Sequence, residues 1–144
     1  METRLDLLDT ELANRIKRTD PGRRRAMALD LARYALTHAS VDNPVVKKTL
    51  EEAAKGGLIQ ASRQKRALEA LVEKLDSIQW NLRKQVDNGE ATIDQYLSAW
   101  QNARAVNALL YALDADTYIA TSEAAYEAYT VTSSLEEIQS ILNS

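Results

Sequence analysis

Residues that break helices are rare in this chain, and they stand near the places where one helix is expected to end and the next to begin. Only four Gly and two Pro occur among 144 residues, and the helix formers Ala, Leu, Glu, Lys, Arg and Gln prevail between them. Each Pro follows Asp or Asn, a combination that starts helices. The sequence therefore predicts an all-α fold, a single compact bundle of six or seven helices over residues 1–144.

The extents of the first helices follow from apolar spacing and from the positions of caps. Apolar residues recur three or four positions apart within each segment, as on one face of a helix. Gly56-Gly57 ends the third segment, because glycine readily adopts the left-handed conformation at a helix end. The first four helices are expected over residues 3–18, 21–39, 44–55 and 58–86.

The C-terminal part of the chain leaves one alternative open. Thr92 forms a capping box with the Gln three residues later and begins a helix, and Ser134 begins a last short helix in the same way. Asp114 either caps a separate helix over about residues 115–129, or it lies within one helix that continues from the Thr92 cap.

Residues suited to catalysis or metal binding are few. The chain has no Cys and one His, which excludes a Cys-ligated metal, a disulfide and a multi-His site within the chain. His38 stands near the end of an expected helix, where an imidazolium favours the helix dipole. Adjacent carboxylates such as Glu51-Glu52 diverge by about 100° on a helix and do not face one substrate. We therefore expect no enzymatic activity, no cofactor and no metal.

The N-terminus and the longest apolar runs bear on where the protein acts. Residues 1–10 alternate acids with leucine and lack the basic start and continuous apolar stretch of a signal peptide. Apolar runs elsewhere fall short of the roughly 18 residues that a membrane-spanning helix needs. A cytoplasmic protein that does not bind membranes is expected.

Charge is distributed unequally along the chain, although the formal net charge is only −3. Residues 1–84 hold 17 of the 18 Lys and Arg residues beside 12 acids, whereas residues 85–144 hold only Arg104 beside nine acids. The two parts carry +5 and −8. The second part is therefore expected to have a negative potential, which attracts basic partners and repels nucleic acid.

Acidic and tyrosine side chains interleave in the C-terminal part, and tyrosine gives an interface a large rigid area with a hydroxyl group. One interpretation is a partner-binding face. A second is that the tyrosines are half-buried core residues and the acids are solvated. A third is that the acidic helices pack against basic ones within the chain. The candidate partner-binding residues are Asp114, Asp116, Tyr118, Glu123, Tyr126, Glu127 and Tyr129.

The basic part of the chain offers a different hypothesis. Arg23-Arg24-Arg25 and the cluster of Arg63, Lys65 and Arg66 are of the kind that contacts phosphates. Acids lie between these clusters, however, and Lys and Arg on helices commonly pair with acids four residues away. The sequence contains no glycine-rich phosphate loop, so nucleic-acid binding is the third function that we consider.

Two segments carry a resemblance to a known family. Asp42-Asn43-Pro44 forms a turn, and the helix that follows, KKTLEEAAKG over residues 47–56, is successively basic, aliphatic and acidic. Gly89-Glu90, with Tyr96 and Trp100 after it, begins another helix. These segments are similar to a turn, its helix and the next helix start in a family of bacterial toxin-immunity proteins. The resemblance implies an all-helical cytoplasmic protein that binds and blocks a cognate toxin without a cofactor.

These observations predict a stoichiometric protein-binding protein, an inhibitor or immunity protein that neutralises a basic toxin through its acidic, tyrosine-rich C-terminal helices. Tyrosine anchors supply affinity in such interfaces, and charges supply association rate and specificity. The alternative is a structural or scaffold protein that forms a homo-oligomer, its basic part packing on the acidic part of another copy. Such charge-driven association weakens as salt rises.

Overall fold

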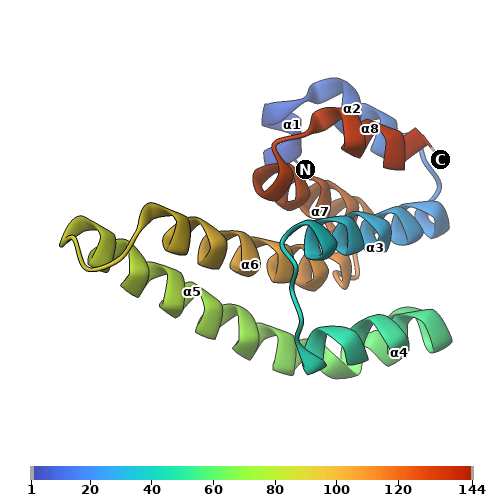
Figure 1. Ribbon diagram of the computed structural model, residues 1–144. Coiled ribbons are helices and arrows are strands. Elements are labelled where there is room, and N and C mark those ends of the chain that lie inside the picture. The colour runs from blue at the N-terminus through green and yellow to red at the C-terminus, as the bar shows by residue number, and fades with distance from the viewer. Residues whose placement is uncertain (1, 144) are drawn as a thin grey trace.

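A computed structural model describes residues 2–143 of the chain, and these residues are almost entirely helical (Figure 1). The all-α prediction is confirmed: seven helices have eight or more residues, and one short helix precedes them. None of the described helices combines the length and the apolar character that crossing a membrane requires. The helices are α1 Arg4–Leu8, α2 Thr10–Lys17, α3 Pro21–His38, α4 Pro44–Ala61, α5 Lys65–Asp87, α6 Ile93–Ala112, α7 Thr117–Thr132 and α8 Leu135–Asn143, with a 3-10 turn η1 at Ser62–Gln64.

Two expected helix boundaries differ from the observed ones. The first expected helix is divided at Asp9, which is extended (φ −152°) and caps α2 by accepting a hydrogen bond from the N–H group of Leu12. The expected break at Gly56-Gly57 is confirmed: Gly57 has a non-helical, positive-φ backbone (φ 66°, ψ −149°) that glycine allows, and it divides α4 by a kink. The helical piece after the kink is short and ends at Ala61, before η1. The next long helix therefore begins at Lys65 and not at Leu58.

The open alternative in the C-terminal part is decided in favour of two helices. The chain leaves α6 at Leu113, and Asp116 caps α7 by accepting hydrogen bonds from the N–H groups of Tyr118 and Ile119. Asp114 supports this turn by accepting from the N–H group of Asp116. The predicted capping box at Thr92 is confirmed, with both of its reciprocal hydrogen bonds present.

The main body is built around α7. This helix packs extensively on α3 and α6, and α1, α2 and α8 also contact it. Alanines 120, 124, 125 and 128 are fully buried on α7, and such small side chains let the neighbouring helices approach closely. The N- and C-terminal helices lie together on one side of α7 in Figure 1.

The antiparallel pair of α5 and α6 forms a long arm. One end of the arm belongs to the main body, because α6 packs on α3 and α7 there. The other end, at residues 88–92, projects beyond every other helix in Figure 1. Outside α6, α5 contacts chiefly α4 and η1. The projecting end of the arm is therefore two helices thick.

Candidate functional site

Two of the predicted partner-binding residues on α7 are buried. Glu123 is 8% exposed and Glu127 is 0% exposed. Both carboxylates bind Arg4 of α1: its Nε donates to Glu123 Oε2 at 2.7 Å, and its Nη2 donates to Glu127 Oε1 at 2.7 Å. The third interpretation of the sequence, an acidic helix that packs against basic residues of the same chain, therefore describes these two acids.

Two tyrosine rings complete the surroundings of Arg4. Its guanidinium carbon lies 4.3 Å from the ring centroid of Tyr126 and 5.5 Å from that of Tyr111, within the range of cation–π attraction. We call this group of Tyr111, Glu123, Tyr126 and Glu127 the Arg4 cage. It is formed by side chains of α6 and α7 around a cation from α1.

A second arginine supports the cage from behind. Arg104 of α6 places Nη1 3.4 Å from Glu127 Oε2, and Nη2 donates to Asp76 of α5 at 2.9 Å. Burial raises the pKa of Glu127, and the charges of Arg104 and Arg4 offset this only in part. The ion pairs thus link α1, α7, α6 and α5 in one network.

A third site residue, Tyr118, also contacts α1. Its hydroxyl donates to Asp6 Oδ2 at 2.8 Å, and Lys17 lies 5.4 Å from the centre of its ring. Burial raises the pKa of Asp6, but hydrogen bonds from Thr3, Tyr118 and Lys17 lower it more, to about 2. Tyr118, Glu123, Tyr126 and Glu127, four of the seven predicted residues, therefore face the chain's own N-terminal helix.

The remaining predicted site residues are dispersed. Asp114 and Asp116 shape the turn before α7, and the ring of Tyr129 is half-buried against the core. The other acids of residues 85–144 stand at the arm tip and on α8. The interpretation of these residues as an exposed partner-binding face does not describe Glu123 and Glu127, whose carboxylates are buried and paired with arginine.

The arginine cluster at the start of α3 also acts within the chain. Arg24 donates to the carbonyl oxygens of Ile16 and Lys17 at the end of α2, at 2.9 and 2.7 Å. Arg25 donates to the carbonyl oxygen of Ala112 at the end of α6, at 2.6 Å. Cations bind favourably to such unpaired carbonyls. Two of the three arginines of this cluster therefore cap helices.

An exposed apolar face that the sequence interpretation missed runs along the arm. Trp80 is 62% exposed and Leu97 is 44% exposed; Ile93 is exposed and Trp100 is half-buried. We call Trp80, Ile93, Leu97 and Trp100 the arm stripe; it includes both tryptophans of the chain. One signal was available: Trp80 falls outside the apolar spacing that places the other apolar residues of α5 against α6.

Contacts between the two helices set the register of the arm. Asp76 pairs with Arg104, and Arg83 stacks over Tyr96 at 5.4 Å. Trp80 stands four residues after Asp76 and three before Arg83, so it lies on the same side of α5. Equal rise along two antiparallel helices then places Trp80 level with Trp100.

The arm stripe is exposed because α7 ends before it. Gln101 of α6 donates to the carbonyl oxygen of Val131 at 3.3 Å, one residue before α7 ends. Ser133 then turns the chain away in the left-handed conformation (φ 59°). Beyond Gln101, the outer face of α6 has no covering helix among those described.

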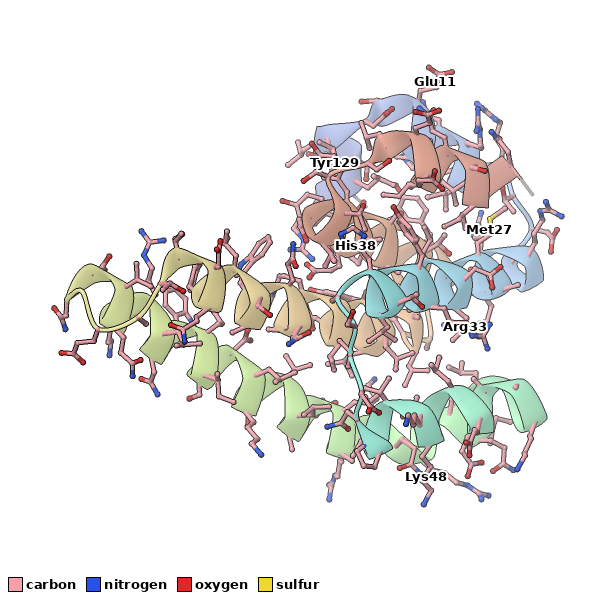
Figure 2. The ribbon with its side chains drawn as sticks, in the orientation of Figure 1. Glu11, Met27, Arg33, His38, Lys48 and Tyr129 are labelled. Carbon is pink, nitrogen blue, oxygen red and sulfur yellow. The ribbon has the colours of Figure 1, made fainter. Side chains whose placement is uncertain are left out.

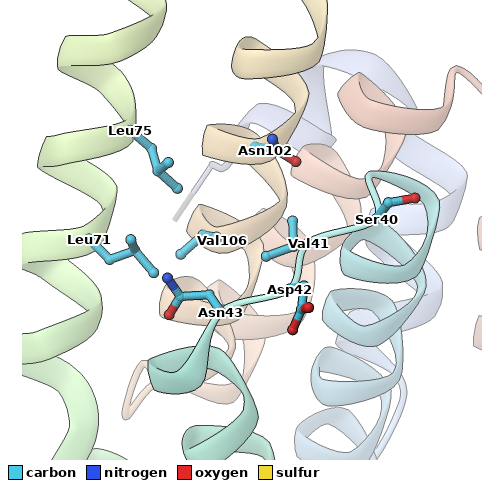
Figure 3. A pocket seen from close by; sticks show the side chains of 8 residues that line it. All are labelled: Ser40, Val41, Asp42, Asn43, Leu71, Leu75, Asn102 and Val106. Carbon is cyan, nitrogen blue, oxygen red and sulfur yellow. The ribbon is translucent and has the colours of Figure 1, made fainter.

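Three other features of the described residues are the single histidine, the distribution of possible metal ligands and a cavity. His38 is exposed at the end of α3 (Figure 2), and its ring lies 6.5 Å from that of Tyr34. Acids and histidines form no group of three that suits a metal ion within residues 2–143. A cavity of about 270 Å³ beside residues 40–43 is lined chiefly by Leu71, Leu75, Val106 and Asn102 (Figure 3).

Comparison of the chain with protein-family models, with curated proteins and with solved structures gives no significant match.

Proposed function

We propose that this protein binds another protein stoichiometrically, as an inhibitor or immunity protein does, and that the partner docks on the arm stripe. The observation that carries the proposal is the exposure of Trp80, Ile93 and Leu97 together on an arm that projects from the body. A grouped, exposed apolar surface of this kind marks interaction sites, and tryptophan is prominent among residues that dominate binding energy.

The shape of the arm favours a helix as the docking element. Near the body, α7 packs on α6, which in turn packs on α5, and the position of α7 on α6 is empty beyond Gln101. An amphipathic helix that lies there buries the arm stripe as α7 buries the inner part of α6. Helix-in-groove recognition uses apolar residues three and four positions apart, and the same spacing separates Ile93, Leu97 and Trp100.

Charge at the arm tip favours a basic partner. Asp87, Glu90 and Asp94 are exposed there; Arg83 pairs with Asp87 at 3.6 Å, and no Lys or Arg occurs from residue 85 to residue 103, so Glu90 and Asp94 carry the excess negative charge. Such a field speeds association with a cationic surface and weakens with salt. A toxin that holds nucleic-acid phosphates has a surface of this kind, which is consistent with the family resemblance.

Matched variants of the full chain test the proposal. Tagged wild type, Trp80→Ala, Leu97→Ala and Ile59→Ala are used as baits at about 0.05 and 0.5 M salt. Ile59 is the control, because it is 78% exposed on α4, outside the arm. The affinity of the captured protein is then measured by titration with purified components.

We expect Trp80→Ala to weaken binding at least about 30-fold, the loss typical of a central tryptophan. Ile59→Ala should bind as the wild type does, and higher salt should slow association. Equal affinity of all four baits would contradict the proposal. Light scattering gives the remaining outcome. If the wild type is dimeric and the Trp80→Ala variant is monomeric, the arm stripe binds a second copy of the chain and not a different protein.

A further inference from the structure

We propose that the Arg4 cage is a guanidinium-binding site, which the chain fills with its own Arg4 and which accepts an arginine side chain of the partner when α1 is displaced. The site consists of two carboxylates and two tyrosine rings around one planar cation. The identity of the incoming group as a partner's arginine rests on the proposed function, whereas the affinity of the cage for a guanidinium does not.

The geometry of the cage selects a guanidinium over an ammonium ion. Arg4 Nε and Nη2 reach two different carboxylates at 2.7 Å, so two edges of the planar group are hydrogen-bonded simultaneously. The close approach to the ring of Tyr126 favours the same flat, weakly hydrated cation. An ammonium ion lacks both the planar face and the fork of donors.

The cage is held in place by the body and not by α1. Its four side chains belong to α6 and α7, which pack extensively on each other. Arg104 holds Glu127 from the opposite side, so Glu127 keeps a cationic partner when Arg4 leaves. With no cation in the cage, Glu127 would be a buried carboxylate with one remaining ion pair, which favours binding of a replacement cation.

The cage is also accessible. The side chain of Arg4 is 39% exposed, and a hollow of about 250 Å³ lies beside Arg4, Leu7, Leu8 and Tyr126. The helix that carries Arg4 has five residues and contacts chiefly α7 and α2. A partner that displaces it must also replace the buried side chain of Leu5. The displacing segment is therefore expected to present an arginine next to an aliphatic residue.

The Arg4 cage and the arm stripe lie along the same face of α6. Ile93, Leu97, Trp100, Arg104 and Tyr111 are three, four or seven residues apart and therefore share one face of α6. The outer end of this face carries the stripe, and the inner end carries the cage. One partner bound along the arm has the cage at the inner end of its docking surface.

Chemical rescue of the full-length Arg4→Ala variant tests the site, with ethylguanidinium as the probe. At a concentration about ten times the dissociation constant, the probe should raise the midpoint of thermal unfolding of Arg4→Ala by about 4 °C. Ethylammonium at equal concentration should raise it much less. The wild type should not respond to either ion, because Arg4 already fills its cage.

Two further variants make the test specific. Lys17→Ala removes a cation that neighbours α1 but lies outside the cage, on the ring of Tyr118, and ethylguanidinium should not stabilise it. Arg4→Met keeps the apolar stem and serves in place of Arg4→Ala if that variant does not fold. The proposal is overturned if neither Arg4 variant responds to ethylguanidinium, or if ethylammonium has an equal effect.

The test also separates this inference from the proposed function. Trp80→Ala combined with Arg4→Ala should retain the rescue, since Trp80 lies on the arm and outside the cage. If ethylguanidinium stabilises Arg4→Ala but no partner is captured, the guanidinium site is supported and the proposal that a partner's arginine enters it is contradicted. A partner that binds through the stripe with no rescue removes the guanidinium site alone.

Discussion

One face of α6 has an inner part, which α7 covers, and an outer part near the arm tip, which no described helix covers. The inner part carries a charged residue and the outer part carries apolar ones, the reverse of the usual distribution. The inner part carries Arg104, which is covered by α7 and bound to the fully buried Glu127. The outer part carries Ile93 and Leu97, which are exposed. Buried charges and exposed apolar groups are the informative departures in a folded protein. Both occur along this face of α6, where the partly buried Arg104 binds the buried Glu127 of α7 and where Ile93 and Leu97 are exposed, so this face holds both proposals.

The difference arises from the lengths of the neighbouring helices. Because α7 ends one residue after Val131, at the level of Gln101, the bundle changes there from three helices to two. The inner part is made rigid by ion pairs that join four helices. The outer part retains apolar surface that a partner can cover.

Truncation of one leucine in the inner half of α6 and one in its outer half gives the largest expected difference, although Leu109 lies on the core-facing side of the helix. Leu109→Ala removes a fully buried side chain and should lower the free energy of unfolding by about 3 kcal/mol. Leu97→Ala removes a side chain that is partly in solvent, so its loss should be below about 1 kcal/mol. Denaturant unfolding at equal protein concentration measures both values.

Equal losses for the two variants would contradict the comparison. They would mean that the outer part of α6 is covered in solution, which only a second copy can do in a pure sample. Repeating the measurement at tenfold lower protein concentration would then show a smaller loss for Leu97→Ala, because dimer stability depends on concentration.

Helix content and most helix starts were predictable from local chemistry. The Asp20 and Asn43 caps before proline and the Thr92 capping box act through atoms a few residues away, and each begins a helix as predicted. The break at Asp9 was not predicted, because apolar spacing continues unchanged through it. Asp9 caps α2 only because α1 turns to bury Leu5 and to bind α7, which is a long-range effect.

The candidate site was predictable in composition but not in exposure. The interleaved acids and tyrosines of α7 do recognise a basic group, and that group is Arg4, more than one hundred residues earlier. Sequence spacing shows which residues share a helix face but not which helix covers that face. For the same reason, the position of Trp80 outside the apolar spacing of α5 did not by itself predict its exposure, since nothing local shows that α7 stops short of it.

Acid titration should resolve the two carboxylates of the α1 contact, which respond in opposite directions. The folded state lowers the pKa of Asp6 to about 2 from its ordinary 3.8. Its contribution to stability is therefore complete above about pH 4 and is lost as the pH falls toward 2. The buried Glu127 has a raised pKa, so its protonation on acidification relieves a penalty and adds stability.

Stability measured from pH 6 to pH 2 checks these signs. Asp6→Asn should show a shallower loss than the wild type below about pH 4. Glu127→Gln should lack the gain in stability that the wild type shows as the pH falls toward 4.5, the ordinary pKa of a glutamate. Asp30→Asn is the matched control, because Asp30 forms an exposed pair with Arg33 on α3 and should follow the wild-type curve. Parallel curves for the wild type, Asp6→Asn and Glu127→Gln would contradict the assignment.

The smallest expected effect is on amide hydrogen exchange, which shows whether the outer arm opens separately from the body. Thr92 caps α6 at the arm tip and Asp116 caps α7 in the body, and loss of either cap should destabilise its helix by about 1 kcal/mol. Thr92→Ala removes a cap that exists only while the arm is folded, so it lowers the free energy of every opening in which the arm unfolds. Amide hydrogen exchange in residues 96–100 should therefore be about fivefold faster. Asp116→Ala should accelerate exchange in α7 by a similar factor and leave residues 96–100 at the wild-type rate. If Asp116→Ala accelerates both segments equally, α6 opens only together with α7, and its inner and outer parts form one cooperative unit.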